Sequence, residues 1–357
     1  MSQSDLARRT QVKLVFDGVD ISASARSYLL SVTYTDNEED ETDDLQIKLQ
    51  DRDGIWLEEW LNAAVDSAAS SDDVKNRLQI QAFFMPKNWG RNSATLDCGR
   101  FELDGVDASG PPAVVSIKAT SLPYSVQFRQ TKKSKAWEAY TLSGIANEMA
   151  AANGMTCMYE STSDPSYARV EQYKESDVAF LSSLCHDAGI SLKVTNHIIV
   201  LFDQSTYEGK GAVATIARGS GKYTKYKLST GTADAEYASC RVSYTDPGTG
   251  QCIEGVARVD DYKADAKNNQ RLEITAKVAN AAEAKSLAAK LLRLHNKYAK
   301  TASFTLPGDP TMVAGVTVML EKWGAWNGKY IIKQAKHTLD SSGYTVQIKL
   351  RKVLEGY

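Results

Sequence analysis

Apolar and polar residues alternate along the first third of the chain, and a two-residue period is typical of strands with one buried face. In residues 45–50, for example, Leu, Ile and Leu alternate with Gln, Lys and Gln. Asp-Gly pairs and the sequence Ser-Gly-Pro-Pro separate the alternating segments and indicate turns. The pattern predicts a small β-barrel or sandwich. Its expected strands lie at 11–21, 27–34, 45–50, 77–85, 96–109 and 113–121, with a short helix at 53–64.

Helical spacing of apolar residues occurs twice in the middle of the chain. Thr141 and Ser176 each precede such a stripe, and both are residue types that cap the N-terminus of a helix. A glycine follows each stripe and is expected to end the helix. The alternating residues after the second stripe predict a hairpin over 190–203. We therefore expect a compact α/β unit over residues 123–215.

Alternation returns after residue 216 and predicts a second β-rich region. Asn280 and Glu283 form the sequence pattern of a capping box, and alanines and leucines follow it at helical spacing, so one long helix is expected at 280–299. The pattern divides the chain into a β unit at 1–122, an α/β unit, and a second β unit at 216–357 with this helix. The expected fold class is α+β, mostly β. The strands expected in the last region lie at 237–246, 251–259, 271–278 and in four segments from 302 to the C-terminus.

The segment TDNEEDETDD, residues 35–44, carries seven carboxylates between two of the predicted strands. A calcium-binding EF-hand loop requires a central glycine and a bidentate glutamate at a fixed offset, and the segment has neither. A disordered tail would continue polar on at least one side, whereas both flanks here are apolar. We therefore predict the tip of a β-hairpin, with solvated charges that repel one another and bind no metal ion.

The composition agrees with an ordinary globular protein of two or three domains. Of the 357 residues, 43% are hydrophobic and 24% are charged, and the net charge of −2 gives no general attraction to nucleic acid or acidic membranes. The sequence contains neither an apolar run of about 20 residues that would span a bilayer nor a signal peptide. The five cysteines are scattered without a Cys-x-x-Cys pair, so we expect buried free thiols in a reducing cytosol.

The titratable residues predict no catalytic, cofactor-binding or metal-ligating site. None of the four histidines lies in a metal-ligand motif, and each is expected to be structural. The Gly-Ser-Gly-Lys sequence within 218–225 lacks the spacing of a phosphate-binding loop and is interpreted as a turn. The neighbouring acids Glu38/Glu39 and Glu58/Glu59 are expected to be solvated rather than to form the acid pair of a glycosidase.

Two further segments have a functional and a structural interpretation. The basic segment 129–138 could indicate nucleic-acid binding, but Trp137 is its one aromatic residue, so we expect a solvated connector or a face that meets an acidic partner. The segment 322–330, with Trp323 and Trp326, could bind carbohydrate. We expect instead a turn whose tryptophans pack against a β unit.

Four segments in order resemble the phage late control protein D family, the baseplate hub of contractile phage tails and related injection machines. The most informative is VEQYKESDVAFLSSLCHDAGISLKV at 170–194, which resembles the Gln-x-x-x-Glu-Ser-Asp-x-x-Phe-Leu pattern of that family. The closing segment resembles its Gly-x-x-x-Gly-x-Tyr-x-Ile-x-x-x-x-His pattern. The two remaining segments lie at 98–112 and 134–155, and the closing segment lies at 323–351.

The resemblance implies a fold of two small tube-forming β-barrels, at 1–122 and 216–357, that flank the α/β domain at 123–215. Three copies would place six barrels in a ring that joins the tail tube to a central spike. The hub is shared with the VgrG proteins of type VI secretion. This chain ends at 357 without a spike β-helix, so the spike is expected to be a separate protein. The implied place is the baseplate of a virion or tail-like particle, assembled in the bacterial cytoplasm.

The implied partners are two more copies of the chain, the spike, the tail tube or its initiator, the baseplate wedge proteins and the tape-measure protein. Neither specific nucleic-acid binding nor membrane insertion is expected. Within this hypothesis the acidic tip at 36–44 could line the bore and repel its cargo. Two other hypotheses remain: a cell-wall hydrolase that travels with tails, and a carbohydrate-binding module that uses Trp323 and Trp326.

Overall fold

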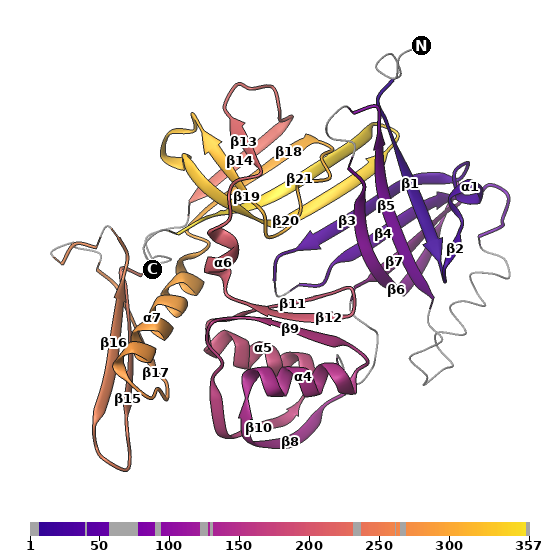
Figure 1. The fold of residues 1–357 in the computed structure, drawn as a ribbon. Coiled ribbons are helices and arrows are strands. Elements are labelled where there is room, and N and C mark those ends of the chain that lie inside the picture. The colour runs from indigo at the N-terminus through magenta and orange to yellow at the C-terminus, as the bar shows by residue number, and fades with distance from the viewer. Residues whose placement is uncertain are drawn as a thin grey trace.

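The computed structural model describes residues 7–354 apart from 40, 57–77, 90–93, 122–127, 129–130, 231–236, 261 and 265–268. Buried apolar side chains gather in four clusters within these residues, one in each of the regions visible in Figure 1. No helix in this part of the chain has the length and apolar character needed to cross a membrane.

A large mixed sheet joins the N-terminal β region to the C-terminal one. Its main path runs β14-β18-β21-β20-β3-β4-β7-β6-β5-β1-β2, and β13 and β19 lie beside it. The junction is the antiparallel pair of β20 (Gly328–Asp340) and β3 (Leu29–Asn37), in which His337 lies opposite Tyr34. Two segments that are about 300 residues apart in sequence therefore share hydrogen bonds in one sheet.

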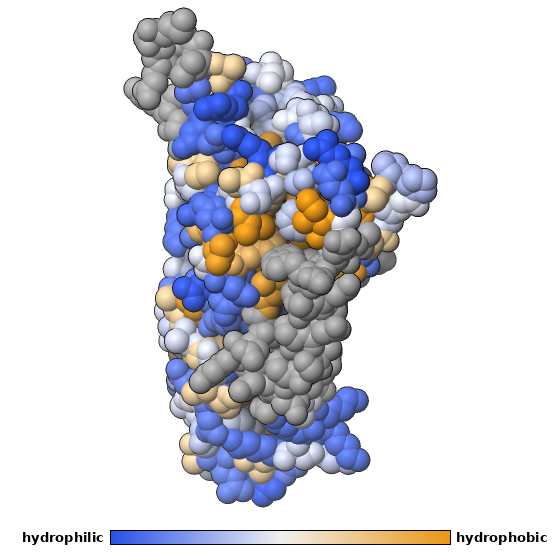
Figure 2. All heavy atoms as spheres, turned by 90° about the vertical axis from the view of Figure 1, so that its right-hand side faces the viewer, coloured by the Kyte–Doolittle hydropathy of each residue, from blue (hydrophilic) through white to orange (hydrophobic). Residues whose placement is uncertain are grey.

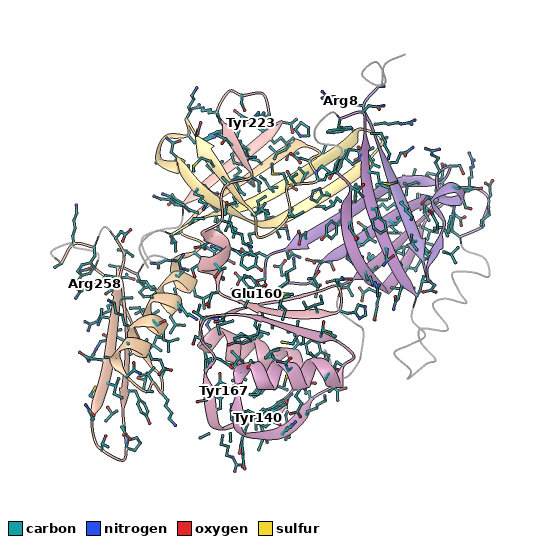
Figure 3. All side chains as sticks on the ribbon, viewed as in Figure 1. Arg8, Tyr140, Glu160, Tyr167, Tyr223 and Arg258 are labelled. Carbon is teal, nitrogen blue, oxygen red and sulfur yellow. The ribbon has the colours of Figure 1, made fainter. Side chains whose placement is uncertain are left out.

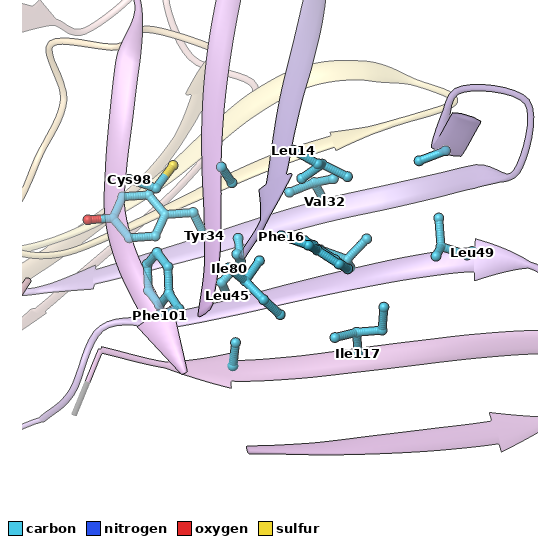
Figure 4. Packing of buried hydrophobic residues seen from close by; sticks show 14 of the residues in the cluster. Leu14, Phe16, Val32, Tyr34, Leu45, Leu49, Ile80, Cys98, Phe101 and Ile117 are labelled. Atoms are coloured by element: carbon cyan, nitrogen blue, oxygen red, sulfur yellow. The ribbon is translucent and has the colours of Figure 1, made fainter. Parts of the chain in front are cut away.

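The N-terminal β region follows the predicted alternation. Its β3–β4 pair is an antiparallel hairpin whose tip is the acidic segment, which confirms that part of the prediction. The buried side chains of the strands in this region form one apolar core, which includes Leu14, Ile80 and Phe101 (Figure 4). The predicted helix at 53–64 lies mostly outside the described residues. The other elements are β1 (Arg9–Phe16), β2 (Val19–Asp20), α1 (Ser22–Ala25), β4 (Asp44–Gln50), β5 (Gln79–Lys87), β6 (Leu96–Ser109) and β7 (Val114–Thr120).

The C-terminal part of the large sheet has its own apolar core, but one of its residues crosses the boundary. Tyr344 belongs to the N-terminal core, where its ring stacks on Phe84. This shared residue adds apolar contact to the β20–β3 pairing. The elements of this region are β13 (Ala214–Ala217), β14 (Lys225–Thr230), β18 (Lys300–Pro307), β19 (Thr317–Glu321), the short 3₁₀ helix η5 (Gly324–Trp326), β20 and β21 (Gly343–Lys352).

The α/β unit has both predicted helices between two small sheets (Figure 1). The Thr141 hydroxyl accepts a hydrogen bond from Gly144 N–H at 3.1 Å, and the Ser176 hydroxyl accepts one from Ala179 N–H at 3.3 Å, so both predicted N-caps are confirmed. The predicted hairpin is also confirmed, as β11 and β12. The elements are β8 (Lys133–Thr141), α4 (Leu142–Ala152), β9 (Thr156–Glu160), β10 (Ser166–Glu175), α5 (Asp177–Asp187), β11 (Ser191–Thr195), β12 (Ile198–Phe202) and α6 (Gln204–Glu208).

The prediction that the basic segment 129–138 is a connector was wrong for its described part. Residues from Lys133 onward form β8, which pairs with β10. The lysines are paired with local acids: Lys133 lies 2.6 Å from Asp177, and Lys135 pairs with Glu148 while its ammonium lies over the ring of Trp137. Trp137 is the one buried residue of β8, so the strand lacks the apolar alternation that identified the others.

The predicted long helix forms as α7 (Ala281–Asn296) and packs on a three-stranded sheet that is separate from the large one. Asn280 accepts a hydrogen bond from Glu283 N–H at 2.9 Å, as the capping box predicts. The sheet consists of β15 (Ser239–Thr245), β16 (Cys252–Arg258) and β17 (Arg271–Thr275), in the order β16-β15-β17. Alternation alone placed these strands in the second β unit, whereas they form a sheet of their own.

The expectation of a mostly β fold is confirmed, with the longer helices gathered in the α/β unit and α7. The closure of the two β regions into barrels and the boundaries at 122 and 215 remain predictions.

Candidate functional site: the acidic hairpin and its cations

Four carboxylates of the acidic hairpin are buried, so the prediction of solvated charges was wrong for them, whereas Glu41 and Asp44 are exposed. The exposed fractions of Asp36, Glu38, Glu39 and Asp43 are 5, 2, 3 and 1%. Three other parts of the chain meet around the tip: β20 and β21 of the large sheet, β11 and α6 of the α/β unit, and the C-terminal end of α7. Each of these carboxylates meets cations or hydrogen-bond donors from these segments, which offset the cost of burial in part. Burial still raises the pKa of Glu38 and of Asp43 above the ordinary values.

Glu38 is held by Arg351, a β21 residue that is fully buried. Arg351 Nε lies 3.0 Å from Glu38 Oε2 and Nη2 lies 2.6 Å from Oε1, which makes a two-point ion pair. The remaining guanidinium nitrogen, Nη1, donates to Glu208 at the end of α6. Glu208 also pairs with Arg293 of α7, so two acids and two arginines form one chain of contacts.

Glu39 meets partners from three different segments. Its Oε2 accepts hydrogen bonds from the Ser191 hydroxyl at 2.6 Å and from Gln204 Nε2 at 2.7 Å, and its Oε1 pairs with the buried ammonium of Lys297. Burial alone would raise the pKa of Glu39. The Lys297 charge and the hydrogen bonds outweigh burial, and the pKa is lowered.

Asp36 and Asp43 share the ammonium of Lys193, which β11 brings against the hairpin. Lys193 Nζ lies 2.7 Å from Asp36 Oδ1 and 3.6 Å from Asp43 Oδ2, and it donates to the carbonyl of Asn37 at 2.6 Å. Burial raises the pKa of Asp43 to about 6, against the attraction of Lys193. Burial acts on Lys193 in the opposite sense, but the two aspartates dominate and its pKa is raised.

Helix α7 presents three cations to the junction from one face. Lys290, Arg293 and Lys297 are three and four residues apart, which is the spacing of one helix side. Lys290 Nζ lies 2.8 Å from Asp203 Oδ1, at the residue before α6. Figure 3 shows side chains gathered around Glu160, at the end of β9 near α6. Glu160 accepts a hydrogen bond from the Tyr207 hydroxyl at 2.5 Å. We call this whole set the charge junction. Its members are Asp36, Glu38, Glu39, Asp43, Asp203, Glu208, Lys193, Lys290, Arg293, Lys297 and Arg351.

The charge junction is built to hold segments together rather than to carry out a reaction. Its carboxylates already bind cations or N–H groups of the chain, which leaves Glu38 and Glu39 unable to face a sugar as a glycosidase pair would. For the same reason Asp36, Glu38, Glu39 and Asp43 cannot form an acidic wall, so the hypothesis that 36–44 could line a bore does not hold for these four residues. Glu58 and Glu59 lie outside the described residues. Among the described residues, no group of three or more His, Cys, Asp or Glu residues is arranged to hold a metal ion.

The four histidines have structural surroundings. His337 is buried, with Nδ1 2.8 Å from the Tyr344 hydroxyl and Nε2 3.0 Å from the carbonyl of Met312, and burial lowers its pKa to about 4. His197 lies in the β11–β12 turn with a φ of 61°. His186 and His295 are exposed at the ends of α5 and α7, with ring centroids 6.4 Å apart.

The remaining candidates are also structural. Trp323 is buried and donates to the carbonyl of Ile216 at 2.9 Å, and the half-buried Trp326 packs on the same core, as the structural interpretation of this segment predicted. The Gly-Ser-Gly-Lys sequence forms a turn between β13 and β14, with positive φ at Gly219 and Gly221. The prediction of buried thiols was wrong for Cys252, which is exposed. Cys98, Cys185 and Cys240 are buried, and Cys157 is partly buried.

Sequence reasoning missed the charge junction because its partners are distant. Arg351 and Lys193 also occupy the polar positions of their alternating strands, after Leu350 and between Leu192 and Val194. A cation at such a position is ordinarily solvated, so no signal in the sequence indicated that these two side chains meet buried anions.

Comparison with known proteins identifies the family. The model of the phage tail baseplate hub family (GPD) matches residues 118–343, well over half of the chain. This chain belongs to that family. The hub resemblance of the four sequence segments is thereby confirmed.

Individual relatives agree with the family assignment. The probable baseplate hub protein of Escherichia phage P2 is 29% identical over 221 residues, which cover 58% of this chain and 50% of the relative. The match thus spans about half the length of that protein. The fold is similar to that of a tail protein from Neisseria meningitidis MC58, with a TM-score of 0.65, 10% identity, and coverage of 96% of this chain and 97% of that one. An E. coli component of the type VI secretion system gives a TM-score of 0.54 at 12% identity, covering 97% and 78%.

Proposed function

We propose that this chain is a structural, non-enzymatic subunit of the baseplate hub in a contractile tail or tail-like injection particle. Three copies form a ring that joins the tail tube to a separate central spike. The two β regions act as tube-forming barrels on either side of the α/β domain. Family membership supports the hub assignment, and the following features of the structure support the ring.

The observation that carries the proposal is a continuous polar face of the large sheet. From β14 through β18, β21, β20, β3 and β4 to β7, side chains alternate between buried apolar and accessible polar residues. We call the accessible side the polar sheet face. Its neutral members are Ser31, Thr33, Thr35, Gln46, Ser116, Ser229, Thr301, Ser303, Thr305, Gln334, Thr338 and Gln347, and its charged members are Lys48, Lys118, Lys225, Lys227, Lys336, Lys349, Asp44 and Asp340.

Cross-strand register places these residues on one side. Thr305 of β18 lies opposite Gln347 of β21, which lies opposite Lys336 of β20, which lies opposite Thr35 of β3. A row of this kind spans both β regions without a break. Short hydroxyl and amide side chains give a smooth, hydrated wall, which suits the bore of a tube through which cargo must slide.

The charge junction supports a rigid subunit. It ties the hairpin of the N-terminal region to β21, α6, β11 and α7, and its ion pairs are buried, so salt screens them weakly. A ring that withstands the contraction of a tail needs subunits whose parts keep their relative positions.

An apolar area on the N-terminal β region fits a covered flank between neighbouring copies. Figure 2 shows apolar side chains gathered near the middle of this side of the molecule, between hydrophilic areas above and below. Val19 and Ile55 are large, exposed apolar residues of this region. Exposed apolar areas of this kind mark contact surfaces, and three-fold closure would bury one on each copy.

Electron microscopy of the assembled particle tests the proposal. The expected image shows three copies of the chain around an open bore, between the tube and the spike. Six copies at the hub position, or a chain located outside the central axis, would contradict it. Clearing of a peptidoglycan suspension by the purified chain would favour the hydrolase hypothesis instead.

A further inference from the structure

The polar sheet face carries an excess of positive charge. Six lysines lie on it, two on β14 and one each on β21, β20, β4 and β7, whereas its acids are Asp44 and Asp340, with Asp107 of the adjoining β6 beside Lys118. The face therefore has the opposite sign to the acidic wall that the hairpin sequence had suggested.

Five of the six lysines lack an ion-pair partner among the described residues. Lys118 lies 2.6 Å from Asp107, while Lys48, Lys225, Lys227, Lys336 and Lys349 are exposed and form no ion pair there. Exposed lysines without an ion pair also occur elsewhere on the described surface, among them Lys132, Lys174, Lys277 and Lys285. The polar sheet face differs because five such lysines share one continuous surface. The unpaired charges of the polar sheet face remain available to an external anion.

The lysines are spread over the face rather than clustered. Lys227 and Lys349 lie in one cross-strand row two strands apart, with Ser303 between them, and Lys225 and Lys336 lie in the next row three strands apart. Strand spacing puts the Cα atoms of these pairs roughly 10 and roughly 14 Å apart. Such a distribution matches an extended polyanion and not a single small anion.

We propose that the polar sheet face contacts the phosphate backbone of double-stranded DNA without reading its sequence. The charges are lysines, which act as flexible point charges toward phosphates, and the one arginine on this side, Arg351, is buried in the charge junction. The face carries none of the stacked aromatic residues that single strands require. It is a sheet surface without a helix or ribbon that could enter a groove.

An acidic protein is the less favoured occupant. Stable protein interfaces are anchored by aromatic or large apolar side chains at their centre. On the polar sheet face, the large apolar residue that is exposed is Leu30, at the β3 bulge near one end. A surface of hydroxyls, amides and spaced lysines instead gives weak, salt-sensitive contact, which lets a passing duplex slide.

Binding of a labelled duplex of about 30 base pairs to the purified full chain, measured by fluorescence anisotropy from about 50 to about 300 mM salt, tests the inference. The variant Lys225→Gln/Lys227→Gln/Lys336→Gln/Lys349→Gln removes four charges from the face. The matched control, Lys132→Gln/Lys174→Gln/Lys277→Gln/Lys285→Gln, removes four exposed lysines from other surfaces. Thermal unfolding of both variants establishes that they remain folded.

The face variant is expected to lose at least tenfold in affinity. The negative slope of log K against log salt should become shallower by up to about 3 to 4, since each phosphate contact contributes about 0.9 to its magnitude. The control should keep the slope. Equal losses in both variants, no binding at the lowest salt, or tighter binding of polyglutamate than of the duplex would each overturn the proposal. These binding measurements do not require an assembled ring. They can therefore refute the DNA contact without refuting the ring, and the imaging experiment can refute the ring without refuting the DNA contact.

Discussion

Arg351 and Glu38 are 313 residues apart in the sequence and form a two-point ion pair in which both side chains are buried, with nitrogen–oxygen distances of 3.0 and 2.6 Å. This contact closes the C-terminal strand of the chain onto the hairpin near its N-terminus. Burying either charge alone would cost free energy, and each charge offsets that cost for the other.

Replacing Glu38 by Gln should therefore destabilise the protein strongly. The substitution keeps the shape but leaves Arg351 with Glu208 as its remaining counter-charge, and breaking a buried pair costs about 3 to 5 kcal/mol. Urea denaturation measures the change in the free energy of unfolding. Glu41→Gln is the matched control, because Glu41 lies in the same acidic segment but is exposed.

The control should change stability by less than about 0.5 kcal/mol. A double-mutant cycle with Arg351→Met should show that the losses from the two sites are strongly non-additive. Equal small effects of Glu38→Gln and Glu41→Gln would mean that the acidic segment is solvated after all.

The free energy of unfolding should change with pH because Asp43 titrates at different pH values in the folded and unfolded states. Its pKa is raised to about 6 by burial and by the nearby Asp36 carboxylate, against Lys193, whereas in the unfolded chain an aspartate titrates at about 3.9. Between these values the folded protein holds a proton that the unfolded chain has lost. This contribution to stability is full below about 4 and disappears as the pH rises through about 6.

Asp43→Asn should remove that dependence. The variant should gain roughly 2 to 3 kcal/mol relative to the wild type between pH 4 and pH 7, measured as the free energy of unfolding at several pH values. Glu39→Gln should show the opposite trend, because the lowered pKa of Glu39 stabilises the fold at higher pH and this stabilisation is lost on acidification. A difference between wild type and Asp43→Asn that is constant over this range would refute the prediction.

Gly255 determines how closely β16 and α7 approach. A Cβ atom at this position would lie 2.2 Å from the backbone nitrogen of Lys285, so Gly255→Ala must separate the strand from the helix. We expect a loss of about 1 to 3 kcal/mol or more, as for overpacking, measured by thermal unfolding. Gly105→Ala in β6 is the control, since no atom lies within 4 Å of its Cβ position. Similar effects at the two glycines would show that backbone freedom, and not the close approach, explains the result.

Phe180 should behave as a core residue of the α/β unit. It is 3% exposed in the cluster that α4 and α5 share, and Phe180→Ala should cost about 3 to 5 kcal/mol in the free energy of unfolding. Tyr173→Ala removes an aromatic ring of similar size that is 68% exposed, and it should change stability little. A loss below about 1 kcal/mol at Phe180 would place this side chain at an interface.

Much of the fold could be predicted from local sequence patterns. The strand alternation, the caps at Thr141, Ser176 and Asn280, and the hairpin around the acidic segment are all confirmed. These features depend on interactions within a few residues, or on which face of an element is apolar, and both are written directly in the order of the residues. The separate sheet β15–β17 was missed because alternation identifies a strand but not its neighbours.

The sequence alone determined that residues 35–44 form a hairpin tip dense in carboxylates, because the apolar flanks fix the strands on both sides. Only the tertiary structure decided that four of these carboxylates, those of Asp36, Glu38, Glu39 and Asp43, are buried. A run of acids can be accommodated either in solvent or beside buried cations, and the local sequence does not distinguish these two environments. The choice depended on Lys193, Lys297 and Arg351, which lie between about 150 and about 315 residues away and reach the tip only when β20 pairs with β3 and α7 packs beside it.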